Sequence, residues 1–362
     1  MNRPILPPRL YLRWKFLAFA ALAALLTIGG EVVLYHTAIA PRFAAIEDEQ
    51  VRRNISRGEE ALKREISYLN DVTADWAAWD DSYAFVRERD PAYVRSNLVN
   101  TTFENLKVNY ILLFDAGGTM VAGRGYDFKN NRGLDIPEGL RARLTPGSFL
   151  LSHAGPESSV AGVLLLPENT LLLVSRPIIT SERRGPVAGT LVMARLIDTG
   201  PAEELSRLTG LDIGLFRMDT TEIPPDVAEA GRALNAGGQE TCIKTFGEGL
   251  IAGYTTVKDI YGRPTLVLRL RQEREVHRAQ LATISVLGGY MTGLLVLATL
   301  TAAVLADRWL FRRLFRLAAV TQKIGENGDF SVRLPVTGSD ELCRLAGNIN
   351  IMLDTLERSQ KE

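Results

Sequence analysis

Apolar positions along this chain gather in two long stretches, residues 16–40 and 281–306. The second stretch contains no charged residue, whereas the first carries Glu31 and His36 in its outer half. A helix needs about 20 apolar residues to cross the hydrocarbon core of a bilayer, so each stretch is long enough to span it. The pattern therefore predicts two transmembrane helices.

The end of the first stretch leaves one alternative open. The sequence Ala38-Ile39-Ala40 is similar to a signal-peptidase site, and cleavage there would remove the first helix. Pro41 follows directly and disfavours cleavage. We therefore expect an uncleaved anchor and keep a cleaved signal peptide as the alternative.

Basic residues flank the two stretches and predict their orientation. Four precede the first stretch and four follow the second: Arg3, Arg9, Arg13 and Lys15, then Arg308, Arg312, Arg313 and Arg316. An excess of Lys and Arg beside a span marks its cytoplasmic side. We therefore expect a multi-pass protein of the inner (cell) membrane, with residues 1–15 and 307–360 in the cytoplasm and residues 41–280 outside.

The outer segment begins with the pattern of a long helix. Apolar or small residues recur at near-heptad spacing, at Val51, Ile55, Leu62, Ile66, Leu69, Thr73 and Trp76, while Arg52, Glu59, Lys63 and other polar residues fill the remaining faces. Such a stripe suits pairing with a second copy of the helix or burial against the helix's own domain. Both alternatives remain open at this point.

Alternating, β-branched segments after this helix predict a mixed α+β fold. A hairpin is expected from Val108 to Val121 around the turn Asp115–Gly118, because alternation flanks a glycine-rich turn. Further strands are expected at 160–166, 171–179, 187–196, 213–216, 250–257 and 264–270, with short helices at 203–208 and 227–234. A second turn, Asp259–Gly262, is similar to the first and indicates two consecutive modules. The last strand leads directly into the second span.

A tryptophan-rich segment near the end of the long helix is the candidate ligand site. Trp76, Trp79, Asp80 and Tyr83 fall at i, i+3, i+4 and i+7, which is one helix face. The face can be a core stripe with Asp80 pairing locally, or aromatic walls beside carboxylates can hold an amine or another cation. Asn97 is a further candidate, with Asp75 and Asp81 as weaker ones.

Composition excludes several other classes of function. The chain has 42 Lys and Arg residues against 42 Asp and Glu residues, and this balance argues against nucleic-acid binding. It holds 3 His residues, so a histidine-rich metal site is not expected, and His153 and His277 are predicted at the surface. Cys242 and Cys343 fall on opposite sides of the membrane and cannot pair. We find no P-loop, HExxH, GxSxG or complete dinucleotide fingerprint, so we expect no metal, no cofactor and no catalytic residue.

The inner segment shows two short apolar seams. Leu310, Leu314, Leu317, Thr321 and Ile324 form the first, and Leu342, Leu345, Ile349, Met352 and Leu356 form the second. Each seam is too short to hold a pair of helices alone, but four of them from two subunits can bury one another in a parallel bundle. A turn-rich connector joins the seams, with Val332, Leu334 and Val336 positioned to pack into that bundle.

The stretch GDFSVRLPVTGSDELCRLAGNINIML closely resembles a HAMP domain, the parallel four-helix relay of bacterial membrane sensors. Asp340 and Glu341 match the acidic pair that opens the second helix of that family. The proline usual near the start of the first helix is absent, and Cys343 replaces a common glycine. Neither departure breaks the apolar seams. The resemblance implies a homodimer that relays a signal through these helices.

The stretch DWAAWDDSY, followed by Asn97 and by FENLKVNYILLFDAGG, resembles the fourth class of CHASE domains. The resemblance implies an extracytoplasmic sensor of the Cache/PAS-like type that binds an unknown small molecule. We expect a receptor that relays ligand binding through the HAMP segment, acting through a partner protein or an output domain beyond Glu362. The alternatives are the input half of a diguanylate cyclase, phosphodiesterase or histidine kinase, and a non-sensing membrane scaffold.

Overall fold

The computed structural model describes residues 8–183, 186–197, 206–207, 209–220, 222–237, 240–336 and 338–361. Contacts divide the chain into two compact units, Ala44–Arg278 and the pair of segments Met1–Phe43 and Ala279–Glu362. The helix expected at 203–208 falls largely outside the described residues. The side chain of His277 is also outside them.

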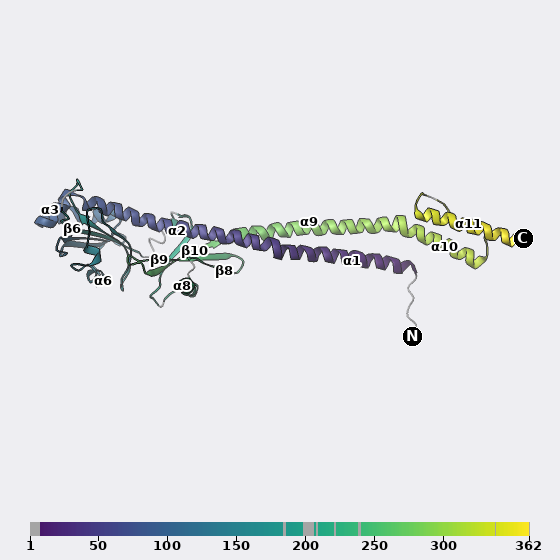
Figure 1. Ribbon diagram of the computed structural model, residues 1–362, viewed down its shortest axis with the longest axis horizontal. Helices are drawn as coiled ribbons and strands as arrows, with labels where there is room; N and C mark the ends of the chain where they lie inside the picture. Colours follow the sequence, from purple (N-terminus) through teal and green to yellow (C-terminus); the bar gives the residue numbers. More distant parts are fainter. Residues whose placement is uncertain are drawn as a thin grey trace. The chain divides into compact units, whose positions relative to one another are not determined.

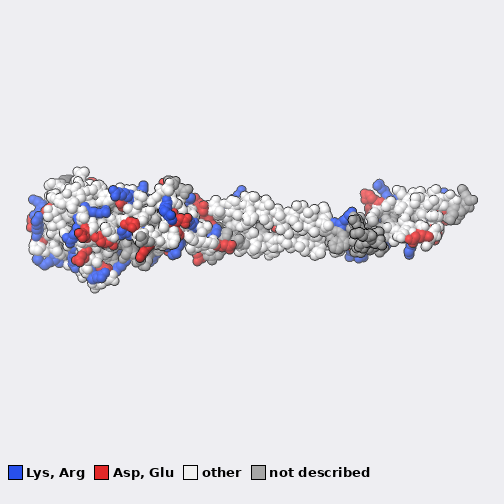
Figure 2. Space-filling view, turned by 90° about the horizontal axis from the view of Figure 1, so that it is seen from below, with Lys and Arg blue, Asp and Glu red and all other residues white. Residues whose placement is uncertain are grey.

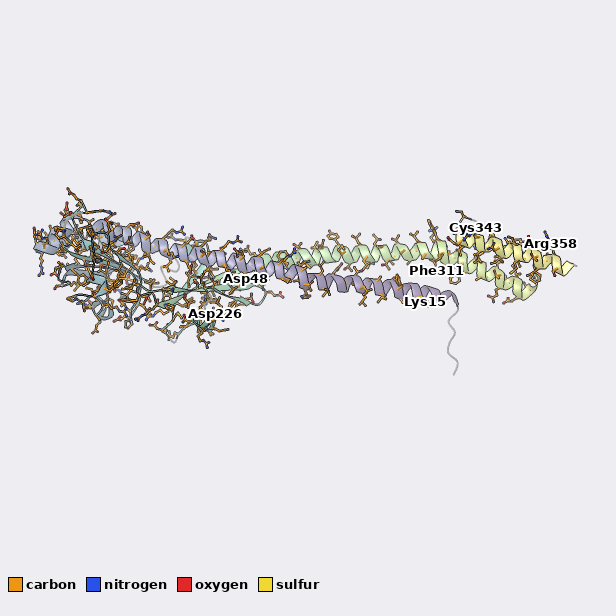
Figure 3. All side chains as sticks on the ribbon, in the orientation of Figure 1. Lys15, Asp48, Asp226, Phe311, Cys343 and Arg358 are labelled. Atoms are coloured by element: carbon orange, nitrogen blue, oxygen red, sulfur yellow. The ribbon has the colours of Figure 1, made fainter. Side chains whose placement is uncertain are left out.

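Two apolar helices correspond to the predicted spans. The first runs through α1 (Pro8–Leu34), a π-helical turn η1 (Tyr35–Ile39) and the start of α2 (Ala40–Ala77), and the second lies in α9 (Glu275–Leu305). Both are long and apolar enough to cross a membrane. Figure 2 shows the nearly uncharged surface that these helices present, and Figure 3 marks Lys15 in α1 and Asp48 in α2.

The unit Ala44–Arg278 contains two antiparallel sheets beside α2 (Figure 1). The first sheet has the strand order β3-β2-β1-β6-β5-β4, and the second has the order β7-β10-β9-β8. The strands are β1 (Tyr110–Asp115), β2 (Met120–Asp127), β3 (Arg132–Leu134), β4 (Val160–Leu165), β5 (Thr170–Ile178), β6 (Gly189–Leu196), β7 (Asp212–Arg217), β8 (Cys242–Phe246), β9 (Leu250–Lys258) and β10 (Pro264–Glu273). The helices of this unit, besides α2, are α3 (Asp80–Glu88), α4 (Pro91–Asn97), α5 (Asn100–Leu106), α6 (Glu138–Arg141), η2 (Phe149–Leu151) and α8 (Pro225–Gly237). The α+β fold and the predicted strands are confirmed, and β3 and β8 were not predicted.

The apolar face of α2 is buried within its own unit. Val51, Ile55 and Leu62 are at most 3% exposed and share one core with residues of both sheets. Burying a side chain of this size contributes about 1.5–3 kcal/mol, so this face holds α2 firmly against the sheets. Of the two alternatives for the stripe, the structure shows burial against the helix's own domain.

Alternating residues of the first sheet face two separate cores. Ile111 and Leu113 pack on the side of α2, whereas Leu112 and Phe114 pack on the other side, which α6 and η2 cover. This is the period-2 pattern of a strand that is buried on both faces. The sheet therefore has no open face along β1.

The two similar turns in the sequence have the same geometry. Asp115 Oδ1 accepts hydrogen bonds from the backbone N–H groups of Gly117 and Thr119 at 3.0 and 2.9 Å, and Asp259 Oδ1 accepts equivalent bonds at 2.9 Å. Gly118 and Gly262 both have φ of 79°, which favours glycine. One such turn lies in each sheet, as expected for two modules.

The second turn also fastens the two modules together. The N–H of Ile260 donates to the carbonyl of Val163 in β4 at 2.9 Å. Gly162 has φ of 156°, and a Cβ built there would come within 3.0 Å of the Ile260 side chain. The hairpin of β9 and β10 therefore docks on the first sheet at a place that requires glycine.

The relay segment consists of two helices joined by an extended connector. A π-helical turn η3 (Ala306–Phe311) leads from α9 into α10 (Arg312–Asn327), and α11 (Glu341–Lys361) follows. Figure 3 marks Phe311 at the start of this segment and Cys343 in α11. The helix α10 ends at Gly328, whose φ of 69° is the usual left-handed stop.

Candidate ligand site and signal relay

The structure separates the residues predicted to share one helix face, Trp76, Trp79, Asp80 and Tyr83. The helix α2 ends directly after Trp76, and α3 begins at Asp80. Trp79 lies between them in an extended conformation, with φ of −110° and ψ of 131°. The prediction of one continuous helix face is therefore wrong, although the two tryptophans remain neighbours.

The aromatic residues at this break pack edge to face. The ring centroids of Trp76 and Trp79 are 5.7 Å apart, and Trp79 lies 6.3 Å from the ring of Tyr93. Trp76 and Tyr83 also pack against the main core, while Trp79 is 36% exposed. The cluster thus contributes to packing and leaves the edge of Trp79 open to solvent.

Asp80 has a hydrogen-bond partner that is distant in sequence. Its Oδ1 accepts a hydrogen bond from the backbone N–H of Ser181 at 2.9 Å, and this bond lowers the pKa of the Asp80 carboxyl. The contact ties the start of α3 to the loop between β5 and β6. The predicted local pairing of Asp80 is therefore not observed, because its partner comes about a hundred residues later in the chain.

Asn97 lies away from the tryptophans. It lines a hollow of about 250 Å³ between α3 and α4, together with Asp81 and Tyr93. Among the described residues that line this hollow, neither tryptophan appears. Asp75 is exposed near the end of α2. The predicted site residues therefore do not converge on one cavity.

His153 is not the surface residue that we predicted. Its Nδ1 lies 2.9 Å from Ser158 Oγ, and its Nε2 lies 3.2 Å from Ser175 Oγ. The Ser175 hydroxyl donates to the carbonyl of Leu150 at 2.5 Å, so it accepts its bond from Nε2–H. Burial, followed by the charge of Arg176, lowers the pKa of His153 to about 4 and keeps the ring neutral at neutral pH.

A larger groove, with a volume of about 690 Å³, lies between α2, β4 and β9. It therefore opens at the junction of the two modules. Its α2 wall contains Arg52, Glu59 and Lys63, which the sequence pattern assigned to solvent-facing positions. The three residues are spaced by seven and then four positions, which places them on one face of the helix. This spacing was the only sign of a shared charged wall that the sequence could offer. The strand β9 lies opposite this face because of long-range packing. The hydrophobic and polar pattern of α2 alone does not reveal that contact.

Among the described residues, the structure shows no group of three His, Cys, Asp or Glu side chains that could hold a metal ion. Cys242 and Cys343 are both free.

Asp340 organises the start of the second relay helix. Its Oδ1 accepts a hydrogen bond from the N–H of Cys343 at 3.0 Å, and Arg313 of α10 pairs with the same carboxylate. The hydrogen bond from the Cys343 N–H lowers the pKa of the Asp340 carboxyl most, and Arg313 lowers it further. Glu341 is exposed in the first turn of α11, where its negative charge interacts favourably with the helix dipole.

The predicted relay seam is only partly covered within one chain. Leu314, Leu317 and Ile349 are half-buried, and Leu345 is 50% exposed. By contrast, the connector residue Leu334 is 2% exposed. Within one chain the connector therefore packs at Leu334, whereas the neighbouring Val332 and Val336 are 40% and 54% exposed; packing of all three into a two-subunit bundle stays a prediction.

One side chain holds the connector in place. Asn350 of α11 accepts a hydrogen bond from the N–H of Leu334 at 2.8 Å and donates one to its carbonyl at 2.9 Å. Arg333 adds ion pairs to Asp354 and Glu357 on the same helix. Both backbone groups of Leu334 are therefore satisfied by one amide. The exposed leucines leave an apolar surface available to further helices.

Comparison with known families identifies two domains in the chain. Residues 61–215 match the CHASE4 domain, and residues 308–358 match the HAMP domain. A methanogenesis regulatory histidine kinase, FilI, from Methanothrix harundinacea is 30% identical over an alignment of 323 residues, and the match covers 86% of this chain and 34% of that protein. The chain thus spans about a third of the length of this curated relative.

Two solved structures are similar to the chain at low sequence identity. One is the extracellular domain of vpHK1S-Z8, named as a histidine kinase, with 15% identity and a TM-score of 0.44 over 67% of this chain and 96% of that one. The other is a domain of a sensory box/GGDEF family protein from Vibrio parahaemolyticus, with 15% identity and a TM-score of 0.43 over 65% and 99%. We base the assignment on the two domain matches and their order along the chain. The chain is therefore a sensor protein that carries a CHASE4 domain and a HAMP domain and has two helices able to span a membrane.

Proposed function

We propose that residues 1–362 form the input part of a dimeric transmembrane receptor in the cell membrane. The sensor unit lies outside, and residues 1–15 and the HAMP segment lie in the cytoplasm. The order of CHASE4 domain, apolar helix and HAMP domain is the observation that carries this proposal. The basic residues beside both spans support the orientation.

The proposed output is protein phosphorylation by a histidine kinase. The match to the histidine kinase of Methanothrix harundinacea extends over 86% of this chain. The domains identified in the chain itself are a sensor and a relay. Catalysis is therefore assigned to a kinase core that is joined to the relay or recruited by it.

The last sheet strand provides the route of transmission. Arg271 and Glu273 belong to β10, and α9 begins at Glu275 with a single residue between. A ligand that binds better to one arrangement of the sheet shifts β10 and hence the second span. Coupling between distant sites is typically worth about 1–3 kcal/mol, which is enough to change the population of two relay packings several-fold.

A small molecule is the proposed stimulus, and the tryptophan pair is one proposed contact for it. The open edge of Trp79 beside Asp80 supports a contact with a cationic group. We expect Trp76→Ala combined with Asp80→Asn to weaken ligand binding while circular dichroism shows a folded sensor unit. Unfolding of this variant would instead assign the cluster to packing alone.

A chimera tests the receptor function directly. Residues 1–362 are joined to a histidine-kinase core, and autophosphorylation is measured in membrane vesicles against a panel of metabolites. We expect at least one compound to change the rate, and we expect deletion of residues 45–275 to abolish that response. A response that persists without the sensor unit would refute the proposal.

A further inference from the structure

The groove between the modules is lined by both sheets and by α2. Its walls come from Arg52 to Ile66 on α2, Ala161 to Val163 on β4, and Thr255 to Asp259 around the end of β9. All of these segments belong to the unit Ala44–Arg278. A volume of about 690 Å³ is within the range of small-molecule sites, about 300–1,000 Å³.

Part of the groove is apolar. Leu62 and Val163 are 3% and 1% exposed, and Ile66 and Val257 are half-buried beside them. Ile66 and Val257 therefore present apolar surface on which a hydrocarbon body can lose water. A ligand that is only an inorganic ion would leave this surface unused.

Three cations line the same groove without a partner. Among the described residues, Arg52, Lys63 and Lys258 have neither a hydrogen bond nor an ion pair from their side chains. All three are exposed to the groove or to solvent. Their charges are therefore available to an anion.

The carboxylates of the groove are mostly occupied. Glu59 Oε1 accepts a hydrogen bond from the Thr255 hydroxyl at 2.8 Å, and the same hydroxyl lies 3.1 Å from the carbonyl of Glu240. Asp259 uses its Oδ1 for the amides of its own turn. The Glu240 carboxylate is exposed at the edge. In the described part of the chain, Arg52, Lys63 and Lys258 are thus the cations of the groove that still lack a partner, and an anionic ligand supplies one.

The register of β9 on α2 places two of the cations at one end. A Cβ at Gly253 would touch Ile55 and Val51, and Thr255 bonds to Glu59. Two strand residues and one helical turn each advance about 6 Å, so Val257, on the same strand face as Gly253 and Thr255, lies level with Lys63. Arg52 lies eleven residues before Lys63 on the helix, about 16 Å away. Lys258 follows Val257 directly and lines the same groove, so Lys63 and Lys258 mark one end of the groove, away from Arg52.

We propose that this groove binds a small organic anion. Its carboxylate lies at the end of the groove marked by Lys63 and Lys258, and its hydrocarbon body lies on Ile66 and Val257. Such a ligand contacts α2, which continues into the first span, and β9, whose hairpin partner β10 leads into the second span. The site is separate from the tryptophan cluster, and its occupancy can be measured without any output activity.

Thermal unfolding of the full chain in nanodiscs tests the proposal. The probes are acetate, succinate, adipate and phenylacetate, with inorganic phosphate and putrescine as comparisons. We expect one or more of the carboxylates with a hydrocarbon body to raise Tm in a saturable way. The double variant Lys63→Gln/Lys258→Gln should weaken this binding by at least about ten-fold.

Arg64→Gln is the matched control, because Arg64 follows Lys63 on α2, is exposed and does not line the groove. It should leave the affinity unchanged, and the unliganded Tm of all variants should agree. No stabilisation by any of the carboxylates would overturn the proposal. So would undiminished binding in the double variant, equal binding of phosphate, or stabilisation by putrescine alone. Each of these results leaves the receptor proposal standing, because it tests the groove and not the relay.

Discussion

A buried ion pair joins the base of α2 to the end of β10. Arg274 Nη2 lies 2.7 Å from Glu47 Oε2, and Arg274 Nε lies 3.2 Å from both carboxylate oxygens. The side chains are 13% and 6% exposed. Arg274 Nη1 also donates to the carbonyl of Gly247 at 3.1 Å. This contact ties together the two elements that continue into the spans.

We expect Arg274→Ala to destabilise the sensor unit strongly, because it leaves the Glu47 carboxylate buried without a partner. Removing one member of a buried pair typically costs about 3–5 kcal/mol. For a unit of this size, about 2–4 °C is lost per kcal/mol, so Tm should fall by about 6–20 °C. Glu47→Ala should have a similar effect, since it leaves the arginine unpaired.

The assay is urea unfolding of residues 41–280, followed through the fluorescence of Trp76 and Trp79. The double variant Glu47→Ala/Arg274→Ala should lose less than the sum of the single changes, by about 1 kcal/mol or more. If the loss in the double variant equals the sum of the two single losses to within about 0.5 kcal/mol, the two side chains do not stabilise each other. That result would refute the reasoning.

Three further changes have defined outcomes. Because the pKa of His153 is about 4 in the folded unit and 6.5 when unfolded, the unfolded chain binds more protons between these values. The free energy of unfolding should therefore fall as pH drops from 6.5 to 4, by at most about 3 kcal/mol, and His153→Gln should flatten this dependence in urea titrations at several pH values. Gly253→Ala should cost about 1–3 kcal/mol, because a Cβ there would lie 2.3 Å from Ile55 Cδ1, and an unchanged Tm would contradict the close packing of α2 on β9. Asn350→Ala removes both hydrogen bonds to Leu334, so hydrogen exchange of the connector amides should accelerate while α11 stays helical. Unchanged protection of the Leu334 amide would contradict this role of Asn350.

Local patterns were sufficient to predict the long helix and most of the strands, although β3, β8 and the short helices α3 to α6 were missed. The strands around Leu112 and Val174 alternate or form short apolar runs, and the turns at Asp115 and Asp259 carry both an acidic side chain and a glycine. These features depend on residues close in sequence, so the structure confirms them. The same holds for the two apolar helices.

The candidate site was harder to predict because it depends on tertiary contacts. Nothing between Trp76 and Tyr83 includes glycine or proline, yet α2 stops before Trp79. There Ala77 accepts a backbone hydrogen bond from Ile179, which is a hundred residues further along the chain. The polar positions Arg52 and Lys63 looked solvent-facing for the same reason: the strand opposite them comes about two hundred residues later.

Placement of the sensor unit and the relay on opposite sides of a membrane is tested most directly by thiol labelling of intact spheroplasts. In a background without Cys242 and Cys343, single cysteines are introduced at Glu88 in α3 and at Ser359 in α11, both of which are exposed. A membrane-impermeant maleimide should label the cysteine at position 88 in intact spheroplasts. It should label the cysteine at position 359 only after the membrane has been permeabilised. Labelling of both positions in intact spheroplasts, or of neither before permeabilisation, would place them in the same compartment and contradict a transmembrane receptor.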